Sequence, residues 1–231
     1  MSALVFSAPS TKVRGMANTA SIGKTILRFG IPLVLGSAGY VAYISGYEDG
    51  PARRDGTPGF KNVVYADQFA GGLPTACLGL TKHASPVPVV LGDYWSDEQC
   101  MAVGSQVLAT GQAQVLACIK VPVTQPMLDA FSSHGHNNGE PSTCASRAMG
   151  LLNTRKYEAA CDALAHGPDG KTPVWSYVKT GRKNAQGAWE YRFVQGLYNR
   201  RLKERADCLA GVALLRAQYD FATESWRGVQ P

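Results

Sequence analysis

Residues 63–81 read VVYADQFAGGLPTACLGLT, and this stretch decides the fold. It opens with the β-branched and aromatic residues of a short strand, and residues 70–74 (AGGLP) are of the types that form turns. Residues 75–79 (TACLG) then supply a returning strand. The stretch therefore predicts a β-hairpin that carries Asp67 and Thr75.

The pattern changes to helices from Ser96 onward. Ser96 precedes an acidic turn that ends at Gln99, an arrangement typical of an N-cap followed by a capping box. Separated by Pro or Gly residues, further helices are expected over 99–118, 124–134, 142–153, 155–165 and 196–218. A small β-hairpin lobe followed by a larger helical lobe predicts an α+β fold with two lobes and a cleft between them.

The composition of the 231 residues fits one domain with an extension, since 45% of them are apolar. The net charge of +6 and the pI of about 9.0 indicate an anionic partner, such as a membrane or a cell wall. The basic residues are scattered and form no continuous run. We therefore expect no nucleic-acid partner, and we expect a monomer.

A run without charged residues extends from Phe29 to Tyr47 and reads FGIPLVLGSAGYVAYISGY. As a helix, this run would be about as long as the core of a bilayer is thick. Basic residues precede it and acidic residues follow it directly, at Lys12, Arg14, Lys24 and Arg28 and then at Glu48 and Asp49. By the positive-inside rule we expect a basic cytoplasmic segment at 1–28, a transmembrane helix of the inner membrane at 29–47, and a periplasmic domain at 48–231.

The same run contains Pro32 and several glycines and serines, so we expect its insertion into a bilayer to be marginal. A cleaved signal peptide is a second interpretation, but no convincing small-x-small site precedes Glu48. A buried helix of a cytoplasmic protein is a third, and it makes the charge asymmetry accidental. A weak transmembrane helix that can later leave the bilayer is favoured, whether Met1 or Met16 is the start.

Six cysteines occur without a Cys-x-x-Cys pair, at Cys77, Cys100, Cys118, Cys144, Cys161 and Cys208. This spacing argues against a zinc ribbon or a thioredoxin-type site. Outside the cytoplasm we expect at least two disulfides, and six buried thiols are the alternative. Many pairings are possible, and the sequence does not select one.

Four motifs, in this order, resemble the phage-type lysozymes of glycoside hydrolase family 24. They are Tyr47-Glu48, the hairpin Tyr65-x-Asp67 with 72–81, the segments 96–100 and 160–164, and the helix Gly196-Leu197-x-x-Arg200-Arg201-x-x-Glu204-x-x-x-Cys208. The uncharged run resembles the signal-arrest-release segments of some phage endolysins. The resemblance implies a lysozyme-like α+β fold and an endolysin that acts on bacterial peptidoglycan.

The resemblance also implies a muramidase, which hydrolyses the β-1,4 bond between N-acetylmuramic acid and N-acetylglucosamine without a cofactor. Glycoside hydrolysis requires one protonated carboxyl group and one ionised carboxylate. In the roles that the family implies, Glu48 is the acid, Asp67 is the ionised partner, and Thr75 orients the water.

Several alternatives stay open. The insertion 51–62 (PARRDGTPGFKN) separates Glu48 from Asp67 by more than the spacing usual in the family. Asp49 or Asp55 could therefore be the acid instead. A lytic transglycosylase would use Glu48 alone. A membrane-tethered wall-binding or virion protein of the same fold would have no activity.

Other residues have simpler interpretations. His134 and His136 lack a clear third ligand, so we expect no metal site. Arg200 and Arg201 are expected to brace the helical lobe through ion pairs. Three aromatic side chains could stack on sugars, and they are Trp175, Trp189 and Tyr191. Such side chains more often belong to a core, so we expect these to be buried.

Overall fold

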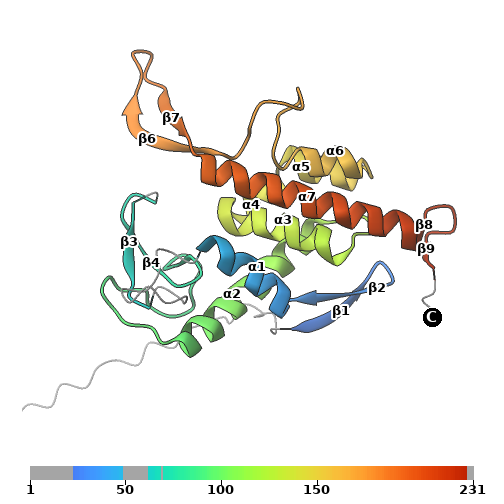
Figure 1. Ribbon diagram of the computed structural model, residues 1–231, viewed down its shortest axis with the longest axis horizontal. Coiled ribbons are helices and arrows are strands. Elements are labelled where there is room, and N and C mark those ends of the chain that lie inside the picture. Colours follow the sequence, from blue (N-terminus) through green and yellow to red (C-terminus); the bar gives the residue numbers. More distant parts are fainter. Residues whose placement is uncertain (1–22, 49–61, 69, 228–231) are drawn as a thin grey trace, which may run out of the picture.

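The computed structural model describes residues 23–48, 62–68 and 70–227. Figure 1 shows a small β lobe and a larger helical lobe, which confirms the predicted α+β class. In chain order the elements are β1 (Lys24–Arg28), β2 (Ile31–Leu35), α1 (Ala38–Glu48), β3 (Tyr65–Asp67), β4 (Leu73–Ala76), β5 (Leu80–Thr81), α2 (Asp97–Cys118), α3 (Gln125–Asn138), α4 (Glu140–Cys144), α5 (Arg147–Asn153), α6 (Tyr157–Asp162), β6 (Tyr177–Lys183), β7 (Trp189–Phe193), α7 (Gln195–Gln218), β8 (Tyr219–Asp220) and β9 (Ser225–Trp226).

The β lobe is an antiparallel sheet with the strand order β3-β4-β5. Its register pairs Tyr65 with Thr75 and Asp67 with Leu73, so the predicted hairpin is confirmed. The returning strand begins at Leu73, earlier than expected. It can begin there because the two glycines before it adopt the positive φ angles that complete the turn.

Helix α2 connects the two lobes (Figure 1). Its N-cap is Ser96, whose Oγ accepts a hydrogen bond from the Gln99 amide at 3.2 Å, as the sequence predicts. Gly104, in the first half of α2, lies so close to Leu78 that a Cβ at this glycine would collide with the leucine side chain. The β lobe therefore packs closely on the first half of α2.

Helices α3 and α7 pack against each other in the helical lobe. Gly211 of α7 permits a close approach, since a Cβ there would lie 2.6 Å from the side chain of Met127. The hydroxyl of Thr124 donates a hydrogen bond to the Gly211 carbonyl at 3.0 Å. Leu128 and Phe131 of α3 are fully buried in the surrounding core, so α3 forms its centre.

The helix expected over 142–153 is divided in two. Helix α4 ends at Cys144, and α5 begins after Ser146, whose Oγ accepts a hydrogen bond from the Met149 amide at 3.1 Å. A side chain that caps a backbone amide favours the start of a new helix. The other predicted helices are confirmed with shifted ends, as α2, α3, α6 and α7.

The six cysteines form three disulfides, in the pairs Cys77–Cys100, Cys118–Cys144 and Cys161–Cys208. The first joins the β lobe to α2, the second joins α2 to α4, and the third joins α6 to α7. Each bridge closes a loop and restricts the unfolded chain, which typically stabilises a fold by about 2–4 kcal/mol. The structure thus agrees with the expected bridges and not with six buried thiols.

The uncharged run 29–47 does not form one continuous helix in this structure. It contributes the turn after β1, the strand β2 and most of α1. Pro32 and the positive φ of Gly36 interrupt a helix, and the apolar side chains find a protein core to pack against. Leu33 and Ile44 are fully buried. Within the described ranges, no helix has both the length and the apolar character needed to span a bilayer.

Some predictions lie outside the described residues. They concern residues 1–22, which include the possible start at Met16, and residues 51–61 of the insertion. The alternative acids Asp49 and Asp55 also lie outside the described ranges.

Candidate active site

Helix α1 ends at Glu48, the predicted acid. The buried side chains of α1 pack against the β lobe and α2, in a cluster of Tyr40, Val41, Ile44, Leu78 and Leu108. Leu78 follows strand β4, and Leu108 belongs to α2. Packing through this cluster fixes α1 at the junction of the β lobe and the connecting helix.

The C-terminal end of α1 contacts the first turns of α7. The ring of Tyr47 lies 4.7 Å from Arg200 Cζ, and the ring of Tyr43 lies 5.1 Å from Lys203 Nζ. Cation–π contacts contribute about 0.5–1 kcal/mol at exposed sites and more where the cation is buried, as Arg200 is. The backbone of Glu48 follows Tyr47 and is therefore held near α7, while its side chain lies outside the described part of the structure.

Asp67 and Thr75 lie on neighbouring strands and on the same face of the hairpin. The register makes them diagonal neighbours, which in an antiparallel pair are typically about 7–8 Å apart. Thr75 is buried, and its hydroxyl donates a hydrogen bond to the Leu73 carbonyl at 3.1 Å. Asp67 is partly exposed, and its Oδ1 accepts a hydrogen bond from the Ala70 amide at 3.4 Å. The structure thus brings two of the three predicted site residues together.

A buried ionic cluster connects α3 and α7 beside the end of α1. Glu204 accepts hydrogen bonds from Arg201 Nη2 at 2.7 Å and from Ser133 Oγ at 2.6 Å. Arg200 Nε lies 3.4 Å from the same carboxylate oxygen. Burial raises the pKa of Glu204, and the two guanidinium groups act in the opposite direction. The expectation that Arg200 and Arg201 brace the helical lobe through ion pairs is confirmed.

His134 and His136 have different partners. Nδ1 of His134 lies 2.8 Å from Thr143 Oγ1, and burial together with two nearby arginines lowers the pKa of this imidazole well below its usual value. Nε2 of His136 lies 3.1 Å from the Leu78 carbonyl oxygen, which ties α3 to the β lobe. The described ranges contain no group of three or more potential metal ligands.

Three aromatic residues expected in the core are instead exposed. The exposed fraction is 37% for Trp175, 46% for Trp189 and 57% for Tyr191. Trp189 and Tyr191 belong to the β6–β7 hairpin, which is not among the elements predicted from the sequence. Both strands of this hairpin are almost wholly exposed, so neither face packs on the core. The expected core position is therefore wrong.

The β6–β7 hairpin and the tip of the β lobe form a pocket of about 370 Å³. In Figure 1 the hairpin lies at the upper left, above β3 and β4. The pocket is lined by Gln68 of the β lobe and by Val178, Lys179, Thr180, Arg182, Glu190 and Arg192 of the hairpin. Gln68 directly follows Asp67, so the pocket opens beside a predicted site residue. These cationic residues were not predicted from the sequence, although 189–193 (WEYRF) alternates aromatic and charged residues as a strand does.

The small β lobe, the connecting helix α2 and the larger helical lobe together form a lysozyme-like α+β fold. A family model described as phage lysozyme matches residues 56–204, which is more than half of the chain. The protein belongs to the phage lysozyme family. It is an endolysin of the muramidase type.

Two relatives named SAR-endolysin agree with this assignment. The chain is 29% identical over 185 residues to a SAR-endolysin of Enterobacteria phage P21, and 28% identical over the same length to one of Enterobacteria phage PA-2. Each match covers 80% of this chain and 96% of the relative.

Similar folds occur in two solved structures. One is the muramidase domain of SpmX from Asticaccaulis excentricus, with a TM-score of 0.55 and 20% identity over 75% of this chain and 96% of that one. The other is the endolysin from Escherichia coli O157:H7 phage FAHEc1, with a TM-score of 0.54 and 24% identity over 75% of this chain and 92% of that one. At these identities the two structures support the fold.

Proposed function

We propose that this endolysin is a family 24 glycoside hydrolase that cleaves the β-1,4 bond between N-acetylmuramic acid and N-acetylglucosamine in bacterial peptidoglycan, during host cell lysis. Its catalytic residues are Glu48, Asp67 and Thr75, and the reaction needs no cofactor. The observation that carries the assignment is the register of β3 and β4, because it puts Asp67 and Thr75 on one face of the hairpin.

The roles follow from the chemistry of glycoside hydrolysis. Glu48 donates a proton to the leaving oxygen, and enclosure at a helix end in a substrate cleft helps a carboxyl group to keep that proton near neutral pH. Asp67 acts in its ionised form and supports the positive charge of the transition state. The Thr75 hydroxyl is oriented by the Leu73 carbonyl, and its oxygen can accept a hydrogen bond from the attacking water.

Substitution of the three residues tests these roles. Glu48→Gln removes the proton donor at constant size and is expected to lower the rate of peptidoglycan hydrolysis by roughly 10²–10⁴-fold. Asp67→Asn is expected to be severely impaired as well, and Thr75→Ala less so. Asp49→Asn and Asp55→Asn are matched controls that should keep their activity. An active Glu48→Gln enzyme beside an inactive control would place the acid elsewhere.

We further propose that residues 29–47 are a signal-arrest-release segment. It first holds the protein in the host inner membrane with the N-terminus in the cytoplasm, and the protein later acts in the periplasm. Two relatives that carry the name SAR-endolysin support this proposal. The charge difference across the segment also supports it, since basic residues precede it and acidic residues follow it.

The burial of this segment explains how release would control activity. Leu33, Leu35 and Ile44 are at most 3% exposed in the folded protein, so they cannot face lipid and the core at the same time. The inserted and folded states therefore exclude each other. Both surroundings are apolar, so exchange between them costs little hydrophobic free energy. In the inserted state Glu48 is fixed at the membrane surface, away from Asp67.

A further inference from the structure

One face of the β6–β7 hairpin is lined by aromatic side chains. In β7, Glu190 and Arg192 line the pocket beside the β lobe, so the residues that alternate with them lie on the opposite face. Tyr177 of β6 pairs with Phe193 across the hairpin, at 5.5 Å between ring centres. The aromatic face therefore consists of Tyr177, Trp189, Tyr191 and Phe193, and it is turned away from the pocket.

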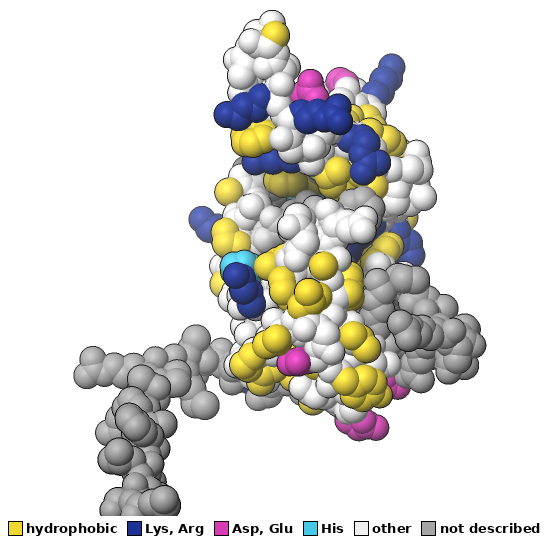
Figure 2. Space-filling view, turned by 90° about the vertical axis from the view of Figure 1, so that its left-hand side faces the viewer, with side chains coloured by type: hydrophobic (Ala, Val, Ile, Leu, Met, Phe, Trp, Pro, Cys, Tyr) yellow, Lys and Arg dark blue, Asp and Glu magenta, His cyan; other side chains and the backbone are white. Residues whose placement is uncertain are grey.

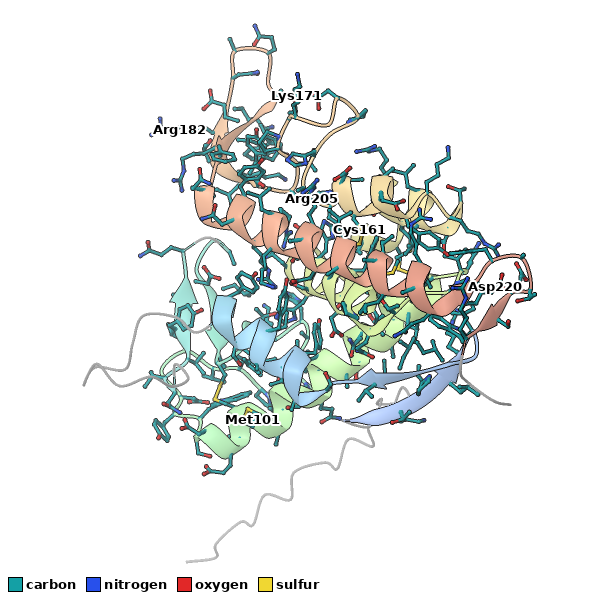
Figure 3. The ribbon with its side chains drawn as sticks, turned by 45° about the vertical axis from the view of Figure 1, so that its right-hand side comes forward. Met101, Cys161, Lys171, Arg182, Arg205 and Asp220 are labelled. Atoms are coloured by element: carbon teal, nitrogen blue, oxygen red, sulfur yellow. A yellow bond between two sulfur atoms is a disulfide. The ribbon has the colours of Figure 1, made fainter. Side chains whose placement is uncertain are left out.

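The aromatic face is anchored at one end and open at the other. The ring of Phe193 lies 5.8 Å from the ring of Tyr198, in the first turn of α7. Trp189 and Tyr191 lie farther along the strand from α7, and 46% and 57% of these two residues are exposed. In Figure 3 the hairpin extends upward beyond α7, with Arg182 on its left. The outer half of the hairpin thus presents two large rings to solvent.

Two lysines add positive charge to the aromatic face. The Nζ atoms of Lys183 and Lys179 lie 4.9 Å and 5.4 Å from the centre of the Trp189 ring. Within the described part of the chain, neither lysine forms an ion pair. Glu190, the one carboxylate of the hairpin, lies on the opposite face. Figure 2 shows Lys and Arg side chains among hydrophobic ones in its upper part, where the hairpin lies.

An anionic membrane surface has the chemistry that fits this face. Trp and Tyr are enriched at the boundary between lipid and water, because their rings combine an apolar body with a polar group. A lysine close to anionic lipid contributes about 1 kcal/mol to binding. The sugars of a glycan could stack on the rings, but they carry no charge to pair with the two ammonium groups. The charge of the aromatic face therefore favours lipid.

We infer that the aromatic face, together with Lys179 and Lys183, docks on anionic phospholipid at the periplasmic surface of the inner membrane. Leu33 and Ile44 are fully buried in the folded protein, so the segment 29–47 cannot hold the folded enzyme on lipid. The hairpin supplies a separate and reversible contact, which weakens as the ionic strength rises. The inference rests on the proposed function only for the identity of the membrane.

The test measures sedimentation of the folded full-length protein with vesicles. One vesicle contains phosphatidylethanolamine and anionic phosphatidylglycerol, and the other contains phosphatidylcholine alone. Two double variants alter the aromatic face, namely Lys179→Gln with Lys183→Gln and Trp189→Ala with Tyr191→Ala. Two matched controls make similar changes at exposed positions outside the hairpin, namely Lys120→Gln with Lys156→Gln and Leu91→Ala with Tyr94→Ala. Thermal unfolding of each variant checks that the fold is kept.

We expect the parent to prefer the anionic vesicles, and the lysine variant to bind them roughly fivefold more weakly for each lysine removed. The aromatic variant should bind more weakly at every salt concentration, because contact between rings and lipid is not screened. Both controls should match the parent. Equal binding to the two vesicles, controls as weak as the hairpin variants, or binding that neither hairpin variant changes would overturn the inference.

A separate assay distinguishes the wall from the membrane as the partner. The parent and both hairpin variants are sedimented with purified peptidoglycan in place of vesicles. Binding to peptidoglycan that the hairpin variants weaken, without binding to either vesicle, would identify a wall-binding face and overturn the inference. Hydrolysis of the same peptidoglycan by the parent is measured in parallel. Its absence would overturn the proposed function and leave the vesicle result intact.

Discussion

A single residue, Asp129, connects the helical lobe to the N-terminal segment through hydrogen bonds. Its Oδ1 accepts hydrogen bonds from Gln112 Nε2 at 2.6 Å and from Gln125 Nε2 at 2.7 Å. The Oε1 atoms of these glutamines accept hydrogen bonds at 2.8 Å from the amides of Gly36 and Val34, respectively. One partly buried carboxyl group thereby orients both side chains that hold the backbone of the N-terminal segment.

The same carboxyl group gives folding a dependence on pH. Burial raises the pKa of Asp129 to about 6, with a smaller contribution from the charge of Asp207, although the two glutamine hydrogen bonds act against it. Between about pH 4 and 6 the folded protein keeps a proton that the unfolded chain has lost. The contribution of this residue to the free energy of unfolding therefore falls over that window, by roughly 3 kcal/mol in total, and is constant above it.

Asp129→Asn tests this contribution because the amide does not titrate. We expect the free energy of unfolding of the variant, minus that of the parent, to rise by roughly 3 kcal/mol as the pH increases from about 4 to 7. Urea unfolding of both proteins at a series of pH values, with disulfides intact, measures the difference. A difference that stays constant with pH would show that Asp129 is ionised in the folded protein throughout.

Residues whose position is determined by their neighbours in the sequence were predictable from the sequence. The glycines before Leu73 set the turn, and the turn sets the register that puts Asp67 and Thr75 on one face. Ser96 was recognised as an N-cap because its cap hydrogen bond lies within the same turn. Asp129 was not recognised, because its partners come from α2 and from the start of its own helix, and its burial depends on the whole core.

At the level of elements, the segment 29–47 shows what hydropathy alone cannot decide. An apolar run satisfies a bilayer and a protein core equally, so the sequence could not show that this run folds as β2 and α1. The β6–β7 hairpin differs in that its alternation was visible in the sequence. Its exposure was not visible, because exposure depends on where the hairpin stands relative to the two lobes.

The glycines of the N-terminal segment are not equivalent. A Cβ at Gly36 would lie 2.9 Å from Ala109 Cβ, and its φ of +59° is unfavourable for other residues, so a larger side chain there disrupts the folded form. At Gly39 the nearest atom is Ser37 Oγ at 3.9 Å, and at Gly46 nothing lies within 4 Å. Substitutions at these two positions can therefore alter insertion into the membrane without causing a clash in the folded protein.

Gly39→Leu with Gly46→Leu is expected to keep the protein in the membrane fraction and to delay lysis, because leucine favours insertion. Gly39→Ala with Gly46→Ala is the control, since alanine also favours a helix but adds less apolar surface. Cell fractionation and the time of lysis measure the effect. Lysis by the leucine variant as fast as by the parent, or periplasmic protein cut near Ser45, would contradict a releasable tether.

In the whole molecule, three parts that are separated in sequence contribute to the proposed site. Helix α1 comes from the N-terminal segment, Asp67 and Thr75 come from the β lobe, and Arg200 of α7 contacts the ring of Tyr47. The disulfide Cys77–Cys100 holds the β lobe on α2. A chain that begins at residue 48 would lack buried core residues such as Leu33 and Ile44. The segment that holds these residues is therefore part of the folded domain.

The end groups of the reaction products test the central claim most directly. Purified full-length protein is incubated with peptidoglycan, and the released fragments are analysed by mass spectrometry. Hydrolysis with Glu48 as acid predicts new reducing ends on N-acetylmuramic acid, and Glu48→Gln should produce none above background. Fragments with 1,6-anhydro ends would identify a lytic transglycosylase, and an absence of new ends would identify a wall-binding protein without activity. Either result would contradict the assignment as a hydrolytic muramidase.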